Sequence, residues 1–101
     1  MGDRAVISIN TIVVAAPGQI ASDLGGEVVI LNMEDGVYYG LDEIGSLVWS
    51  LIQEPRSVAT IRDLLLEEYA VEADRCEHDV LALLDDMTAR SLIEVRDEKT
   101  I

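Results

Sequence analysis

Apolar and polar residues first alternate along the chain and then recur every three or four positions. An alternating run rich in β-branched residues lies at 27–33, and shorter runs that favour a strand lie before and after it, at 11–15 and 37–41. A period of two predicts β-strands. Asp35-Gly36 separates the last two runs, and this pair is typical of the tight turn of a β-hairpin. Residues 19–23 are compatible with a further extended piece, and 5–9 with a strand or a frayed arm.

Three amphipathic helices are predicted after the hairpin. Asp42 is expected to cap the first helix, which Glu54-Pro55 should end, since the residue before proline avoids the helical conformation. Ser57 is expected to cap a second helix over 58–69. A third helix, 74–89, has an apolar face made of Cys76, Val80, Leu83, Leu84 and Met87. The remaining expectations are a stop at Arg90-Ser91, a short closing strand at 92–95 and a frayed end at 97–101.

The strands precede the helices in this order, with one short strand after them. Such segregation predicts an α+β fold rather than a parallel α/β sheet. We expect a three-stranded antiparallel sheet followed by three helices, in an arrangement like a winged helix-turn-helix. The whole chain, 1–101, is expected to form one domain with a core of about 12–95.

The charge of the chain restricts its partners. Its 101 residues have a formal net charge of −13, which argues against nucleic acid and against anionic membranes. The predicted third helix carries mainly acidic residues, so a DNA-recognition role for it is not expected. A single cysteine, no signal peptide and no apolar run of transmembrane length together indicate a cytoplasmic protein without a membrane partner.

Candidate catalytic and metal-binding residues are few. Cys76 and His78 are the only cysteine and histidine, and a spacing of two on a helix turns their side chains away from each other. Asp74 and His78 have helical spacing, but no second cluster completes a metal site. Gly25-Gly26 lacks the lysine and the spacing of a phosphate-binding loop. We therefore expect no enzyme activity, no metal and no cofactor.

The remaining candidate site is the backbone of the strand at 37–41. If this strand lies at a sheet edge, an added peptide strand could pair with it. Alternation places Val37, Tyr39 and Leu41 on the core face, and Tyr38 and Gly40 on the other. Gly40 either permits a close backbone approach or marks a bulge. A groove between this edge and the third helix would have apolar walls and an acidic rim.

A longer motif resembles the PqqD-like family, which includes the precursor-peptide recognition elements of ribosomal peptide biosynthesis. The residues that carry the resemblance are Gly26-Glu27-x-Val29-x-Leu31-Asn32, Gly36-x-Tyr38-Tyr39-Gly40-Leu41-Asp42, Gly45-x-x-x-Trp49 and Asp79-Val80-x-x-Leu83-Leu84. Among its members, the standalone leader-binding protein of lasso-peptide pathways is the most similar in character. One difference is Asp42, where many relatives have asparagine, and either residue caps a helix.

The resemblance implies a non-catalytic domain that binds the leader of a precursor peptide as an added β-strand, clamped by the third helix. Carried onto this chain, it implies a peptide-binding set of Val37, Tyr38, Tyr39, Gly40, Leu41, Cys76, Asp79, Val80 and Leu83. The implied partners are the leader peptide, a cysteine leader peptidase subunit and a lasso cyclase. Replacing Val80 or Leu83 by Asp is expected to weaken peptide binding and to leave the fold intact. The alternative functions are a winged-helix regulator and a general protein-interaction domain.

Overall fold

The structure is a computed structural model and describes residues 7–96. Its elements in chain order are β1 (Ile12–Ala15), β2 (Gln19–Asp23), β3 (Val28–Asn32), β4 (Tyr38–Gly40), α1 (Glu43–Leu51), β5 (Arg56–Ser57), α2 (Val58–Glu68), α3 (Ala73–Ala89) and β6 (Ile93–Arg96). The predicted α+β class and the three helices are confirmed. The predicted arm or strand at 5–9 lies partly outside the described residues, and the predicted frayed end lies wholly outside them.

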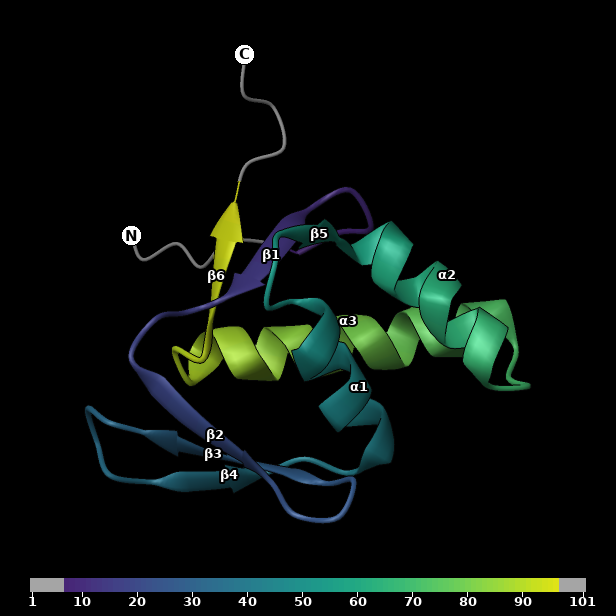
Figure 1. The fold of residues 1–101 in the computed structure, drawn as a ribbon. Coiled ribbons are helices and arrows are strands. Elements are labelled where there is room, and N and C mark those ends of the chain that lie inside the picture. Colours follow the sequence, from purple (N-terminus) through teal and green to yellow (C-terminus); the bar gives the residue numbers. More distant parts are fainter. Residues whose placement is uncertain (1–6, 97–101) are drawn as a thin grey trace.

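The strands form two antiparallel sheets rather than one. The first has the order β2-β3-β4 and the second the order β5-β1-β6, with the helices between them (Figure 1). Gly18, at φ 87°, allows the turn by which the chain leaves β1 in the second sheet and enters β2 in the first. The two residues of β5 are too few to produce an alternating pattern, which is why the sequence did not reveal this strand.

The helices begin where the sequence predicted. The Asp42 carboxylate accepts a hydrogen bond from the backbone N–H of Gly45 at 2.8 Å, and the Ser57 hydroxyl accepts one from Thr60 at 3.1 Å. Helix α1 ends at Leu51, three residues before the expected stop at Glu54. Its last carbonyls have partners outside the helix, since the Arg56 side chain donates to Leu51 O at 2.6 Å. Tertiary bonds therefore fix this boundary.

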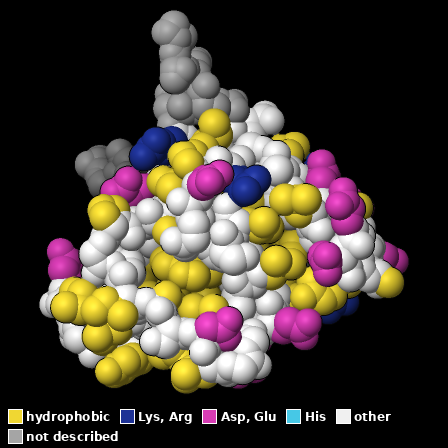
Figure 2. All heavy atoms as spheres, viewed as in Figure 1, with side chains coloured by type: hydrophobic (Ala, Val, Ile, Leu, Met, Phe, Trp, Pro, Cys, Tyr) yellow, Lys and Arg dark blue, Asp and Glu magenta, His cyan; other side chains and the backbone are white. Residues whose placement is uncertain are grey.

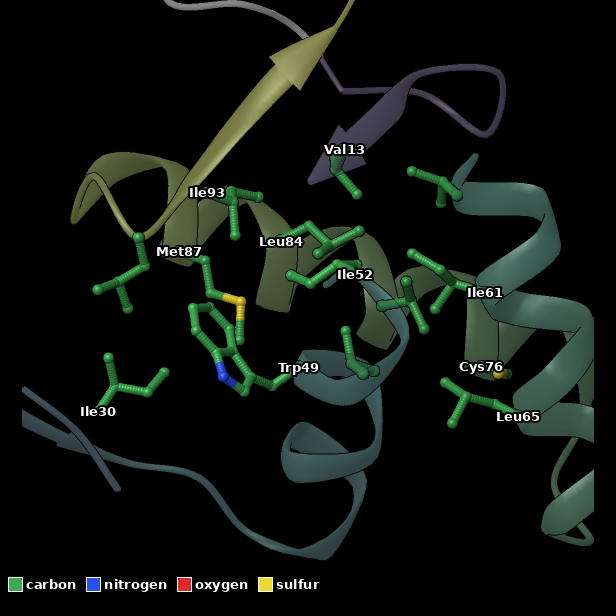
Figure 3. Close-up of a cluster of buried hydrophobic side chains, with 14 residues drawn as sticks. Val13, Ile30, Trp49, Ile52, Ile61, Leu65, Cys76, Leu84, Met87 and Ile93 are labelled. Carbon is green, nitrogen blue, oxygen red and sulfur yellow. The ribbon is translucent and has the colours of Figure 1, made fainter. Parts of the chain in front are cut away.

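One hydrophobic core joins all three helices to both sheets. Trp49 of α1 lies between Ile30 of β3 and Met87 of α3, as Figure 3 shows. The other fully or nearly buried members are Val13, Val48, Ile52, Val58, Ile61, Leu65, Cys76, Val80, Leu84, Leu92 and Ile93. Burial of a side chain of this size contributes about 1.5–3 kcal/mol, so this cluster dominates the stability of the domain.

Ser46 attaches the first sheet to α1. Its buried hydroxyl accepts a hydrogen bond from the Val28 N–H at 2.8 Å and donates one to the Leu41 carbonyl at 3.3 Å. Leu41 also donates its N–H to Val28 O at 2.8 Å. Ser46 thus holds the start of β3 and the end of β4 together, and it fixes the edge strand beside the helices.

Asn32 attaches the other end of the same hairpin. Its buried side chain donates to the carbonyl of Arg90 at 3.3 Å and accepts from the N–H of Glu34 at 2.9 Å. The hairpin turn that follows contains Gly36 at φ 69°, as a tight Asp-Gly turn requires. Together, Ser46 and Asn32 hold the two ends of the hairpin, one against α1 and the other against the C-terminal end of α3.

Candidate functional site

Strand β4 lies at the edge of its sheet and pairs only with β3. The register places Tyr39 opposite Ile30 and Gly40 opposite Val29. Asn32 N–H donates to Val37 O, and Leu41 N–H donates to Val28 O, so positions 37, 39 and 41 direct their backbone groups toward β3. Because antiparallel strands alternate in this respect, the N–H and C=O groups of Tyr38 and Gly40 point out of the sheet. These four groups are available to an added strand.

The side chains of β4 follow the predicted alternation only in part. Tyr39 and Leu41 are half-buried and pack against the core, as expected. Tyr38 is 68% exposed on the opposite face. Val37, assigned to the core face from the sequence, is 44% exposed. It precedes the first residue of β4 and belongs to the turn, where the alternation no longer determines which side is buried.

Gly40 lies in the strand without a bulge, because its pairing with Val29 continues the register. A Cβ at this position would have no heavy atom within 4 Å. The chain's own packing therefore does not require glycine here, and the close approach proposed from the sequence is not made by any described part of the chain. The open space beside Gly40 is at the sheet edge, next to the outward-pointing backbone.

A groove of about 250 Å³, here called the edge groove, lies between β4 and the second half of α3. It is lined by Tyr38, Tyr39, Gly40, Leu41, Leu83, Asp86, Met87, Arg90 and Leu92. The guanidinium of Arg90 lies over the Tyr39 ring, 4.8 Å from its centroid, and also pairs with Asp86 at 3.1 Å. Contacts with Tyr39 first, and with Asp86 second, raise the pKa of Arg90, so it remains a cation at this end of the groove.

A second hollow, here called the apolar pocket, has a volume of about 100 Å³ and is enclosed by all three helices. It is lined by Ile44, Leu65, Tyr69, Val71, Arg75, Cys76, Asp79, Val80 and Leu83. Leu83 lines both the apolar pocket and the edge groove, so the two are adjacent. The Asp79 carboxylate lies at the exposed rim, 3.9 Å from Arg75. The arrangement suits an apolar side chain inside and a polar or cationic group at the mouth.

The thiol in the apolar pocket is not an activated nucleophile. Burial raises the pKa of Cys76 above its ordinary value of 9.0, and the Asp79 carboxylate raises it further, whereas the Arg62 guanidinium lowers it by less. Its sulfur donates a weak hydrogen bond to the carbonyl of Arg62 at 3.9 Å. A thiol with a raised pKa is mostly protonated at neutral pH and behaves as a small apolar group.

The structure divides the predicted site residues between these two hollows, except for Val37, which lines neither. Cys76, Asp79 and Val80 line only the apolar pocket, while β4 lines only the edge groove. The helical wall that faces β4 consists instead of Leu83 and its neighbours one and two turns on, Met87 and Arg90. Met87 continues the apolar spacing of α3, so the sequence contained a signal for it. Arg90 and Ser46 had no such signal, because their roles depend on contacts between distant elements.

The expectation that Val80→Asp leaves the fold intact needs a correction. Val80 is 3% exposed and belongs to the core, although it lines the pocket. An acidic residue there would bury a charge without a partner, which costs several kcal/mol, so we now expect Val80→Asp to unfold the domain. Leu83 is half-buried between the two hollows and packs against the core cluster from outside, so replacing it should disturb the core less than replacing Val80 does. Leu83 is thus the position at which to test the site.

Residues 7–96 contain neither a cluster of metal-ligating side chains nor a membrane-spanning helix. Within that range no three His, Cys, Asp or Glu side chains lie close enough together to hold a metal ion. In the same part of the chain, no helix is long and apolar enough to cross a membrane. His78 is exposed on α3 and Cys76 is buried, so the two side chains lie on different faces, as the spacing predicted.

The fold and the site define a small α+β domain in which the sheet edge at β4 lies open beside a helix. The family whose description is coenzyme PQQ synthesis protein D (PqqD) matches the chain over residues 27–93, and this protein belongs to that family. The resemblance noted from the sequence motifs is thereby confirmed. No curated protein matches the chain.

Two solved structures are similar to this one. TbiB1, in complex with the TbiA(β) leader peptide, is 31% identical and has a TM-score of 0.75, with 80% of this chain and 94% of TbiB1 covered. A lasso peptide synthetase B1, complexed with the leader peptide, is 22% identical and has a TM-score of 0.73, with 81% and 96% covered. At that lower identity the second likeness bears on the fold alone.

Proposed function

We propose that this protein binds the leader region of a ribosomally synthesised precursor peptide of the lasso kind and does not catalyse a reaction itself. One observation carries the proposal: a protein that is 31% identical over most of this chain has been solved with a leader peptide. The open edge of β4 and the two adjacent hollows give this chain a place for such a peptide.

The leader is proposed to add as an antiparallel strand to β4, since every strand pair in this sheet is antiparallel. Its backbone would bond to the outward N–H and C=O groups of Tyr38 and Gly40. Alternate leader side chains would then point into the edge groove, toward Leu83 and Met87. Each hydrogen bond contributes about 0.5–1.5 kcal/mol, and buried apolar side chains supply the rest of the affinity.

The positions of the two hollows along β4 decide which part of an antiparallel leader would lie at each of them. The apolar pocket includes Ile44, which comes just after the C-terminal end of β4. Arg90 lies toward the other end, because its carbonyl is bonded by Asn32, whose backbone pairs with Val37 just before β4. In an antiparallel pair, the N-terminal part of the leader would therefore reach the apolar pocket. Its C-terminal part would leave beside Arg90 and Tyr38.

The charge of the protein favours a basic leader. The net charge is −13, and Asp79 and Asp86 lie on the exposed side of α3 along the proposed path. Lysine side chains of the leader would be attracted to this rim, and salt would weaken the attraction. The same acidic face of α3 disfavours the alternative of a DNA-binding regulator.

The bound precursor is proposed to pass to a cysteine leader peptidase and a lasso cyclase, in the cytoplasm. In this scheme the recognition domain supplies binding and orientation, while the partner enzymes supply the chemistry.

Fluorescence anisotropy of a labelled lasso-type leader, titrated with this protein at low and at physiological salt, tests the proposal. We expect saturable binding that is weaker at the higher salt. Leu83→Asp should reduce the affinity at least tenfold, because it places a charge in the apolar contact. Leu24→Asp is the matched control, since Leu24 is an exposed leucine away from both hollows and should bind as the native protein does.

Circular dichroism of each variant confirms that it is folded. No binding of any of several lasso-type leaders by the folded native protein would refute the proposed function. Equal affinity of the folded Leu83→Asp variant would refute the proposed location.

A further inference from the structure

A polar hollow outside the proposed leader site is lined by residues of both sheets. It has a volume of about 440 Å³ and is here called the inter-sheet cleft. Three connections of the chain meet there, from β1 to β2, from β3 to β4 and from α3 to β6 (left in Figure 1). The polar residues that line it are Gln19, Asn32, Glu34, Ser91 and Glu94.

The side-chain amide of Gln19 is poorly satisfied at the wall of this cleft. Its nitrogen donates one long hydrogen bond, to the carbonyl of Ser91 at 3.5 Å. Its oxygen, Oε1, is buried and has no hydrogen-bond partner among residues 7–96. A buried acceptor without a partner is unfavourable, because its bonds to water have not been replaced. Rotation of the amide by half a turn would place Oε1 beside the Ser91 carbonyl, and both oxygens could then accept from a donor in the cleft.

The charge around the inter-sheet cleft favours a cation. Glu34 and Glu94 are exposed and line it, and no lysine or arginine of the described chain does so. Acidic side chains are spread over the face shown in Figure 2, with few basic ones between them, in keeping with the net charge of −13. A cationic group with several N–H donors, such as the ammonium of lysine or the guanidinium of arginine, matches both the unpaired acceptor and the carboxylates.

The inter-sheet cleft adjoins the edge groove. Arg90 and Leu92 line the edge groove, whereas Ser91, between them in the chain, lines the cleft. Asn32 also lines the cleft, and its side chain bonds to the Arg90 carbonyl at 3.3 Å. The C-terminal part of the proposed leader strand would leave beside Tyr38, the first residue of β4 after the hairpin turn. The precursor residues that follow the paired segment would therefore begin close to the cleft.

We propose that the inter-sheet cleft binds a lysine or arginine side chain of the precursor, in the segment that follows the part paired with β4. This inference rests on the proposed leader binding and adds a second determinant of specificity to it. The oxygens of Gln19 and Ser91 would accept from the cationic N–H groups, while Glu34 and Glu94 would supply negative charge. A neutral side chain of the same length would leave the Gln19 amide as poorly satisfied as it is in the free protein.

The test uses pairs of labelled lasso-type leaders that differ at one position beyond the paired segment. One member has lysine there and the other has norleucine, which is uncharged and of similar length, and the position is moved stepwise along the segment. In anisotropy titrations at low salt, we expect the lysine peptide to bind about three- to tenfold more tightly at the best position, from a partly exposed ion pair and new hydrogen bonds. The NMR signal of the Gln19 side-chain amide should shift with the lysine peptide and not with the norleucine peptide.

Three variants locate the cation. Gln19→Leu and Glu94→Gln should each remove most of the preference for lysine. Gln19→Leu keeps the net charge, so its effect would come from the amide and not from general attraction to an acidic protein. Glu27→Gln is the matched control, because Glu27 is an exposed glutamate that lines none of the three hollows, and it should retain the preference. Circular dichroism confirms that each variant is folded.

Equal affinity for the two peptides at every position would overturn the cleft proposal and leave leader binding standing. A lysine preference that survives in Gln19→Leu and in Glu94→Gln would also overturn it, since the cation would then be held elsewhere on the acidic surface. Butylammonium distinguishes a free amine from the precursor: a Gln19 shift with butylammonium, but with neither peptide, would assign the cleft to a free ligand and overturn the proposal. Failure of the native protein to bind either peptide would instead refute the proposed function, and the cleft proposal with it.

Discussion

Gly40→Pro tests how much the backbone of β4 contributes to leader affinity, because it leaves the side chains around the edge groove unchanged. The N–H of Gly40 points out of the sheet, so its removal takes no hydrogen bond from the pairing of β4 with β3. Proline is tolerated in an edge strand when its nitrogen faces outward. The free energy of unfolding should therefore change little, whereas the proposed leader strand would lose one donor.

The expected effect on leader affinity has two parts. One lost hydrogen bond weakens binding by about 0.5–1.5 kcal/mol, which corresponds to about 2- to 13-fold in Kd. The proline ring also occupies the space along the former N–H direction, where the leader backbone would lie, and this adds to the loss. We expect a total increase in Kd of about tenfold or more.

Two neighbouring variants serve as controls in the same anisotropy and thermal-unfolding measurements. Gly40→Ala keeps the N–H and adds a methyl group with no heavy atom within 4 Å, so both affinity and stability should remain native-like. Tyr39→Pro removes an N–H directed at Ile30, leaving a sheet carbonyl without its donor, and should cost about 1–3 kcal/mol of stability. A folded Gly40→Pro variant with native leader affinity would refute strand addition at β4.

Three further predictions concern residues that hold the site in place or line it: Ser46, Asn32 and Cys76. Ser46→Ala leaves the N–H of Val28 without its partner and should lower the free energy of unfolding by about 1–3 kcal/mol in urea titrations, unlike a surface serine-to-alanine change. Asn32→Asp places a carboxylate against the Arg90 carbonyl and should destabilise by a similar or larger amount, with less loss at low pH, where the new carboxyl is protonated. Cys76 should react with iodoacetamide far more slowly in folded than in urea-unfolded protein, and a bound leader should slow it further. Since its pKa is raised on folding, its contribution to stability is full below about pH 9 and declines as the pH rises through the folded-state pKa. Equal alkylation rates in the folded and unfolded protein would contradict its burial.

Local patterns predicted the hairpin and the helices well, because their causes are local. Asp42 and Ser57 cap helices through bonds to residues three positions away, and Asp35 accepts a hydrogen bond from the N–H of Val37 within its own turn. The second sheet was not predicted, since β5 is two residues long and exists only because β1 lies beside it. The end of α1 depends likewise on a distant partner, as Ile52 O accepts from the N–H of Ala15 at 2.7 Å.

The sequence predicted which residues of the candidate site share a helix face, but it did not predict which other elements they contact. Periodicity correctly placed Cys76, Val80 and Leu83 on one face of α3, but a face of a long helix extends past several neighbours. It does not say which residues meet the sheet and which meet the other helices. Only the packed structure shows that Leu83 stands at the boundary, with Cys76 and Val80 on the side of α2.

The pairing of β1 with β6 has a consequence for protein engineering. Ile12 lies opposite Arg96, so the first and last strands of the described chain lie side by side, in the sheet that does not contain β4 (Figure 1). Linkers joined at these two strands would begin a few ångströms apart and would not cross the edge groove. The domain is therefore suited to insertion into a loop of a host protein, which would acquire a peptide-recognition module without rearranging its own chain.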